Sequence, residues 1–302
     1  MTFRHLRWDD SHPRWSTLWI DVADRKLNVL FEEVFDEVRT IAERLLDSDP
    51  ARPVVLRSGK PKGFVVGADV RRIGMLTSED QVRAFLEHGQ RVFELWESLP
   101  QTTIACISGA ALGGGLEWTL ACDVRLASRS PDTLMGLPEV HLGLSPAWGG
   151  TQRLVRLLGI ERAVPMLMHG NALDAESAFR MALVDGLWTP GEDADLQLGA
   201  WLDASLASAL RSRIPFDRSA ALEAWLALHP DSIAFLEEGL PDEQRWKIET
   251  RRTIAHSIET GLRESMAAGQ RAEREQFFGM MQRPEVQLAM QRFTKPAERA
   301  SS

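Results

Sequence analysis

The chain has 302 residues, of which 44% are hydrophobic and 26% charged, and its formal net charge is −8. A globular protein with one large core has this length and composition. The acidic balance disfavours a nucleic-acid binder that works by bulk charge. No window approaches the roughly 18 unbroken apolar residues that a membrane span requires, and the first residues carry no secretory signal pattern. We therefore expect a soluble protein without nucleic-acid or membrane partners.

The two cysteines, Cys106 and Cys122, are too few for a disulfide framework and lack the paired spacing of a zinc site. Both lie in apolar surroundings and are expected to be small buried hydrophobic residues. This usage points to a reducing compartment, and we expect the cytoplasm.

The first 130 or so residues alternate between strand and helix patterns. Strands are expected over 15–22, 54–56 and 102–107, where apolar runs are bounded by turn-forming residues. One helix is expected over 31–46 from its apolar spacing, and a second begins after the N-cap candidate Ser78. This alternation predicts a layered α/β core.

From about residue 195 the strand patterns disappear and glycine becomes sparse. We expect residues 1–195 to form the α/β core and residues 196–302 to form a helical region. The apolar stripes of its helices must be buried on the core or on a neighbouring subunit. The sequence assigns no role to the segment 191–240. Helical periodicity is found over 196–210, 220–228, 248–266 and 272–281.

A run of three glycines, Gly113 to Gly115, follows the strand at 102–107 and leads into an apolar, helical segment. Glycine lets a backbone approach a ligand closely, and a helix N-terminus offers free N–H groups. Such a turn suits an anion, or an oxygen that becomes anionic during a reaction if the turn Gly67-Ala68-Asp69 supplies a second donor. The alternative is that the glycines serve tight packing between helix and strand.

Two glutamates lie close to these turns in the sequence. Glu117 falls in the first turn of the expected helix, where a carboxylate is also favourable through the helix dipole alone. Glu139 follows a proline at a strand or loop end, where a solvated side chain is common. Together the two carboxyls could share one water and divide the acid and base roles. Spacing makes this pairing possible and does not establish it.

These motifs, in this order and at this spacing, resemble the crotonase (enoyl-CoA hydratase/isomerase) superfamily over residues 15 to 190. The stretches 58–69 and 257–262, with the tail from 273 to 293, look closest to the hydratase half of the alpha subunit of the multifunctional fatty-acid oxidation enzyme. The dehydrogenase half of that enzyme is not expected here. The segments that carry the resemblance are Gly67-Ala68-Asp69, Ala111 to Glu117, Ala121-Cys122-Asp123, Gly136 to Glu139, and Gly149 to Leu154.

The resemblance implies a superhelix of β-β-α turns with a helical C-terminal region that covers the active site and assembles trimers or pairs of trimers. It implies an enzyme of fatty-acid metabolism, a lyase that hydrates enoyl-CoA in β-oxidation. Coenzyme A would be part of the acyl-CoA substrate, with no separate cofactor and no metal.

The family's roles transfer to matching positions of this chain. The resemblance implies that the backbone N–H groups of Ala68 and Gly114 hold the thioester oxygen as enolate charge develops. Glu117 would deprotonate the water that attacks C3, and Glu139 would deliver the proton to C2. Neighbouring residues of the same turns are implied to line the substrate: Gly67, Asp69 and Gly113.

Three further residues are candidates for substrate contact. Lys26 and Lys60 flank the expected mouth and could bind the phosphates of CoA, although a solvated basic face is an equal alternative. Trp148 stands where the family often has a small residue, and could reshape the acyl pocket or pack in a surface turn.

Two other functions stay open. A Δ3-Δ2-enoyl-CoA isomerase, or other crotonase-type acyl-CoA chemistry, would use one glutamate as the proton shuttle. A non-catalytic binding protein of the same fold would typically have lost a glutamate or the glycine run. Because this sequence keeps Glu117, Glu139 and the glycines, hydration is the favoured prediction.

Overall fold

A computed structural model describes residues 3–211 and 216–294. Among these residues, six strands form the main sheet in the order β1-β2-β3-β4-β6-β9, and β5, β7 and β8 form a smaller one. Every pairing in the main sheet is parallel except β1 with β2. The strands are β1 Leu6–Asp9, β2 Ser16–Ile20, β3 Val54–Ser58, β4 Thr103–Ile107, β5 Ala111–Leu112, β6 Val124–Ser128, β7 Leu134–Gly136, β8 Leu173–Asp174 and β9 Gly186–Trp188.

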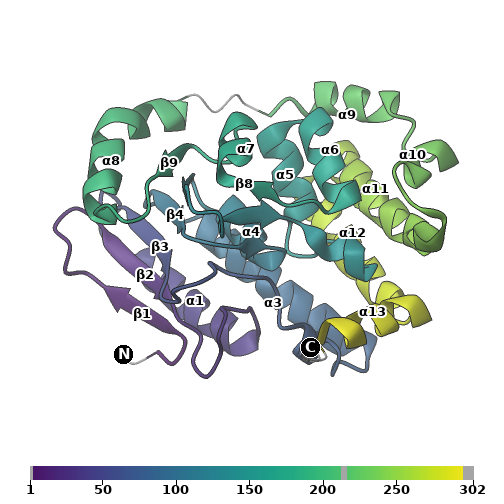
Figure 1. Cartoon of the computed structure of the whole chain (residues 1–302), viewed down its shortest axis with the longest axis horizontal. Helices are drawn as coiled ribbons and strands as arrows, with labels where there is room; N and C mark the ends of the chain where they lie inside the picture. Colours follow the sequence, from purple (N-terminus) through teal and green to yellow (C-terminus); the bar gives the residue numbers. More distant parts are fainter. Residues whose placement is uncertain (1–2, 212–215, 295–302) are drawn as a thin grey trace, which may run out of the picture.

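Helices cover the sheet and form most of the second half of the chain (Figure 1). Two short 3₁₀ helices, Pro138–Leu142 and Asp242–Lys247, join larger elements. The α-helices are α1 Glu32–Leu45, α2 Val70–Ile73, α3 Glu79–Glu97, α4 Gly114–Leu120, α5 Gly150–Leu158, α6 Ile160–His169, α7 Ala175–Arg180, α8 Ala194–Arg211, α9 Arg218–Ala227, α10 Ile233–Glu237, α11 Ile248–Arg263, α12 Met266–Met281 and α13 Pro284–Thr294.

The predicted strands and helices of the first half are confirmed to within a few residues. The side chain of Ser78 accepts the amide of Gln81, whose own side chain returns a bond to Ser78, so α3 begins with a capping box. Strand β1 was not predicted, although its sequence Leu-Arg-Trp-Asp alternates between apolar and polar residues, because the run is only four residues long. In the second half, the helix expected over 248–266 instead ends at Arg263, and Met266 begins the next helix.

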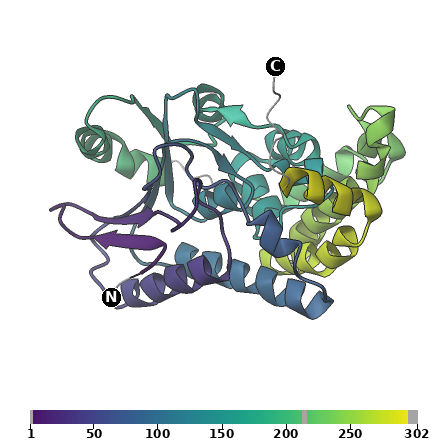
Figure 2. The ribbon, with the colours of Figure 1, turned by 60° about the horizontal axis from the view of Figure 1, so that its bottom comes forward.

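Both faces of the main sheet are covered. Helices α1 and α3 contribute buried apolar residues to the large core, and Figure 2 shows them along one side of the molecule in purple and blue. Helix α8 covers the other face, where Leu198 and Leu202 pack in a second cluster with Val55, Ile104 and Val124. Helix α8 therefore buries apolar residues on the core, one of the two places expected, and this gives part of the segment 191–240 a structural role. No described helix is long and apolar enough to cross a membrane.

The C-terminal helices gather at one end of the molecule (Figures 1 and 2). Helix α11 packs along α12, and α12 in turn contacts α3 and α5 of the first two thirds of the chain. Residue 195, the expected end of the core, lies in the first turn of α8. The two cysteines are buried and free, as predicted.

Candidate active site

Two glycine turns lie against each other at the centre of the site. Gly67 and Gly113 have φ angles of +105° and +53°, which a residue with a side chain rarely adopts. A Cβ on Gly67 would lie 3.2 Å from the carbonyl oxygen of Leu112, so the two backbones are nearly in contact. Hydrogen bonds fix each turn: Leu30 N donates to Gly67 O, and Gly113 N donates to Gly136 O, at 2.9 Å each.

The predicted donor amides, those of Ala68 and Gly114, lie on these two turns. Ala68 pairs with Leu30 in an isolated bridge whose hydrogen bonds use the neighbours of Ala68 and leave its own N–H out. Gly114 is the first residue of α4, where helix geometry leaves the N–H without an intrahelical acceptor. No acceptor among residues 3–211 and 216–294 bonds to either amide. Two such donors suit an oxygen that gains negative charge.

Glu117 lies in the first turn of α4, as predicted, and is 1% exposed. Its Oε1 accepts the backbone amides of Trp148 at 2.8 Å and Gly150 at 2.7 Å. Burial raises the pKa of Glu117 to about 7, although these two hydrogen bonds favour the charged form. A carboxyl with a pKa near neutrality can accept a proton during a reaction and release it afterwards.

Glu139 lies in the 3₁₀ helix Pro138–Leu142, three residues after the last residue of β7. A Cβ on Gly113 would be 2.9 Å from its Oε1, which places the carboxyl beside the second glycine turn. Its Oε2 is buried and has no hydrogen-bond partner in the described part of the chain. Burial, and then the charge of Glu117, raise the pKa of Glu139 well above its usual value. The structure thus brings the two predicted glutamates together.

A third buried carboxyl, Glu273 of α12, was not predicted. Its Oε2 accepts the amide of Gly149 at 2.9 Å, and its Oε1 accepts the amide and the hydroxyl of Thr151 at 3.2 and 2.5 Å. Four consecutive amides, those of residues 148–151, therefore bind Glu117 and Glu273 in alternation. Burial, and then the charge of Glu117, raise the pKa of Glu273 to about 8.

A sequence signal for Glu273 does exist. Phe277, Met280 and Met281 follow Glu273 at spacings of four, seven and eight residues, so helical periodicity places Glu273 on the apolar face of its helix. A charged residue on an inward face needs a partner inside the protein.

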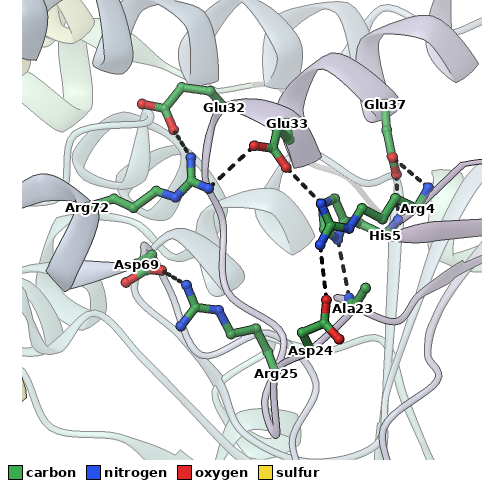
Figure 3. Close-up of polar contacts among 10 residues, drawn as sticks. All are labelled: Arg4, His5, Ala23, Asp24, Arg25, Glu32, Glu33, Glu37, Asp69 and Arg72. Atoms are coloured by element: carbon green, nitrogen blue, oxygen red, sulfur yellow. Dashed lines mark hydrogen bonds and ion pairs between the residues drawn. The ribbon is translucent and has the colours of Figure 1, made fainter.

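Asp69 and its neighbours form a polar network at one side of the site (Figure 3). The Asp69 side chain caps α2 and pairs with Arg25 at 2.8 Å. Arg72 of α2 reaches Glu32 and Glu33 of α1 at 3.3 and 3.4 Å. These contacts join the loop before α1 to the helix that follows Ala68. Asp69 therefore supports the donor turn, and direct contact with substrate stays a prediction.

The two predicted phosphate ligands differ in their surroundings. Lys60 is mostly buried, and its Nζ donates to the carbonyl of Val22 at 2.8 Å and pairs with Asp21 at 2.5 Å. Lys26 is exposed. Lys26 is thus the freer of the two to meet an anion. No group of three or more His, Cys, Asp or Glu side chains within the described ranges is arranged to hold a metal ion.

Trp148 is buried, with 3% of its surface exposed, so the interpretation as a residue of a surface turn is wrong. Its ring packs among the phenylalanines Phe35, Phe85 and Phe93. The predicted alternative, a place beside the acyl pocket, stays open.

The fold is that of crotonase-type proteins, as comparison with solved structures shows. An enoyl-CoA hydratase from Bacillus anthracis aligns over 96% of this chain and 95% of its own, with 26% identity and a TM-score of 0.57. DspI from Pseudomonas aeruginosa is 30% identical over 78% of this chain and 96% of its own, with a TM-score of 0.60. A carnitinyl-CoA dehydratase from Mycobacterium thermoresistibile, 18% identical over 96% and 89% of the two chains, has a TM-score of 0.68.

The family follows from the sequence itself. The enoyl-CoA hydratase/isomerase family model matches residues 16–195. The chain belongs to this family, and the resemblance to the crotonase superfamily is confirmed. The finer likeness to the alpha subunit of the fatty-acid oxidation enzyme stays a prediction.

Proposed function

We propose that the protein is an enoyl-CoA hydratase, a lyase that adds water syn across the 2,3 double bond of a 2-trans-enoyl-CoA to give a 3-hydroxyacyl-CoA. The observation that carries this proposal is the pair of buried carboxyls, Glu117 and Glu139, beside two backbone amides that bond to no acceptor in the described part of the chain. Hydration of an enoyl thioester requires these elements: a base for water, an acid for C2 and a site for the enolate oxygen.

The raised pKa values favour different roles for the two glutamates, with Glu117 as the base and Glu139 as the acid. The pKa of Glu117 is about 7, so a large share of its carboxyls are ionised at neutral pH. Burial, and then the charge of Glu117, raise the pKa of Glu139 well above its usual value, which favours its protonated form as the acid. In the proposed step, Glu117 takes a proton from water as the water oxygen bonds to C3. The π electrons move toward the thioester oxygen, which the amides of Ala68 and Gly114 hold.

The second half of the proposed reaction forms the C2–H bond. The enolate collapses, its electrons take the proton of Glu139, and the thioester carbonyl is restored. Glu117 is then protonated and Glu139 ionised, and proton exchange with solvent returns both to their starting forms. The reaction consumes one water. It needs no redox cofactor because it transfers no net electrons, and CoA is part of the substrate.

We further propose that Lys26 binds the CoA phosphates, and that the helices after residue 195 assemble trimers or pairs of trimers.

The test is the loss of the enoyl-thioester absorbance of crotonyl-CoA with wild type, Glu117→Gln and Glu139→Gln. Wild type should hydrate the substrate, and each variant should lose at least a hundredfold in kcat while remaining folded. Glu161→Gln, on the protein surface, is the control and should keep wild-type activity. Full activity in Glu117→Gln would refute the assigned roles. Isomerisation of a 3-enoyl-CoA without hydration would instead support the isomerase, because Glu139 alone can shuttle that proton.

A further inference from the structure

Trp148 places a large side chain directly against one of the donor turns. A Cβ on Gly114 would lie 2.2 Å from ring atom Cζ3 of Trp148, and a Cβ on Gly89 of α3 would lie 2.4 Å from Nε1. The indole therefore occupies the space between α4 and α3, and it fits because both neighbours lack side chains. The backbone amide of the same residue donates to Glu117. Trp148 thus contacts both halves of the proposed catalytic apparatus.

Three phenylalanines fix the orientation of the indole. The ring centroids of Phe35, Phe85 and Phe93 lie 5.0, 5.5 and 6.1 Å from that of Trp148, at interplanar angles of 79°, 67° and 82°. Edge-to-face packing of aromatic rings is favourable, and a buried ring among three others has little room to rotate. The indole is therefore a rigid wall rather than a movable cover.

This wall would stand in the path of a long acyl chain. With the thioester oxygen at the amides of Ala68 and Gly114, C2 and C3 lie beside the glutamates. Carbons from C4 onward would then run along the turn at Gly114, against which the Trp148 ring packs. A cavity of about 210 Å³ under α8, lined by Trp188, Trp201 and other residues, lies elsewhere.

We propose that Trp148 restricts the substrate to short acyl chains: thioesters of about four carbons are accepted, and those of eight or more are rejected. This inference rests on the proposed function and specifies its substrate class. A methylene that finds an apolar pocket tightens binding about fourfold. In this protein, carbons beyond C4 add no such binding affinity, because the indole already occupies the space that they would need.

Binding of saturated thioesters tests the inference without turnover. Butyryl-CoA and decanoyl-CoA are titrated by calorimetry into wild type, Trp148→Ala and Trp148→Phe. Wild type should bind butyryl-CoA at least tenfold more tightly than decanoyl-CoA, and Trp148→Ala should bring the two affinities level or reverse their order. Trp148→Phe, which keeps an aromatic ring in the core, should lie between them. Trp96→Phe changes another fully buried tryptophan, one that packs on Trp118, and should keep the wild-type order.

The outcomes separate the two proposals. Tighter binding of decanoyl-CoA by wild type, or an unchanged ratio in both Trp148 variants, overturns the chain-length inference and leaves hydration intact. If wild type binds neither thioester and does not hydrate crotonyl-CoA, the proposed function itself fails, and the inference fails with it.

Discussion

Replacing Glu117 with glutamine should make the protein more stable at neutral and alkaline pH while abolishing hydration. Glutamine can keep the acceptor oxygen that binds the amides of Trp148 and Gly150, so the change removes the charge and leaves the contacts. A pKa raised from 4.5 to about 7 corresponds to about 3 kcal/mol of preference for the neutral form. Ionisation of Glu117 should lower the free energy of unfolding of wild type by up to this amount, because the carboxylate is hydrated in the unfolded chain and buried in the folded one.

The sign follows from proton linkage. The folded state binds the Glu117 proton more tightly than the unfolded state does, so this contribution to stability is fully present below about pH 4.5 and is lost as pH rises through about 7. The free energy of unfolding of Glu117→Gln minus that of wild type should therefore grow between pH 5 and 7 and level off near 3 kcal/mol.

Urea unfolding at pH 5, 6, 7 and 8.5 measures this difference, and the pH 5 value is the internal reference. A difference that stays constant across the series would show that the carboxyl titrates alike in both states. A difference that shrinks with rising pH would show that the site stabilises the charged carboxylate, which would refute the reasoning for a neutral-pH base.

Other substitutions test the surroundings of the site. Gly114→Ala places a Cβ 2.2 Å from the Trp148 ring, so it should cost about 1–3 kcal/mol of stability, seen as a lower Tm, and most of the activity. Asp69→Ala removes the cap of α2 and should cost about 1 kcal/mol, measured by urea unfolding; an unchanged midpoint would contradict this. Lys26→Ala should raise KM at low salt with kcat unchanged, an effect that added salt removes. Lys60→Ala should lower Tm, because its Nζ bonds within the fold.

The local parts of the site could be predicted from the sequence because each depends on a few adjacent residues. A glycine run after a strand and before a helix predicts a turn with a free helix N-terminal amide, and in the described part of the chain the amide of Gly114 is of this kind. The same short pattern places Glu117 in the first helical turn. The α/β order of the first half was predictable for the same reason, since apolar spacing and the Ser78 cap are local.

The long-range parts could not be predicted in the same way. Glu139 lies near Glu117 because β7 pairs with β5, and because Gly136, the last residue of β7, accepts the amide of Gly113. The spacing between two glutamates in the sequence does not predict which strands pair. Glu273 bonds to Gly149 across 124 residues of chain. The sequence leaves open whether the Trp148 side chain lies in a surface turn or in the interior. In the structure it is in the interior, where it packs against three phenylalanines.

The amides of residues 148–151 bind Glu117 and Glu273 in alternation, and Glu273 comes much later in the chain than the rest of the site. The ribosome makes both glycine turns, Glu117 and Glu139 before it makes Glu273. Two of the four hydrogen bonds from the amides of residues 148–151 can therefore form only after α12 has been made. A nascent or truncated chain that ends at residue 195 contains the whole segment that matches the family and lacks this carboxylate. Motifs in such a fragment identify the family, whereas two of the hydrogen bonds to the amides of residues 148–151 come from Glu273, which lies outside the matched segment.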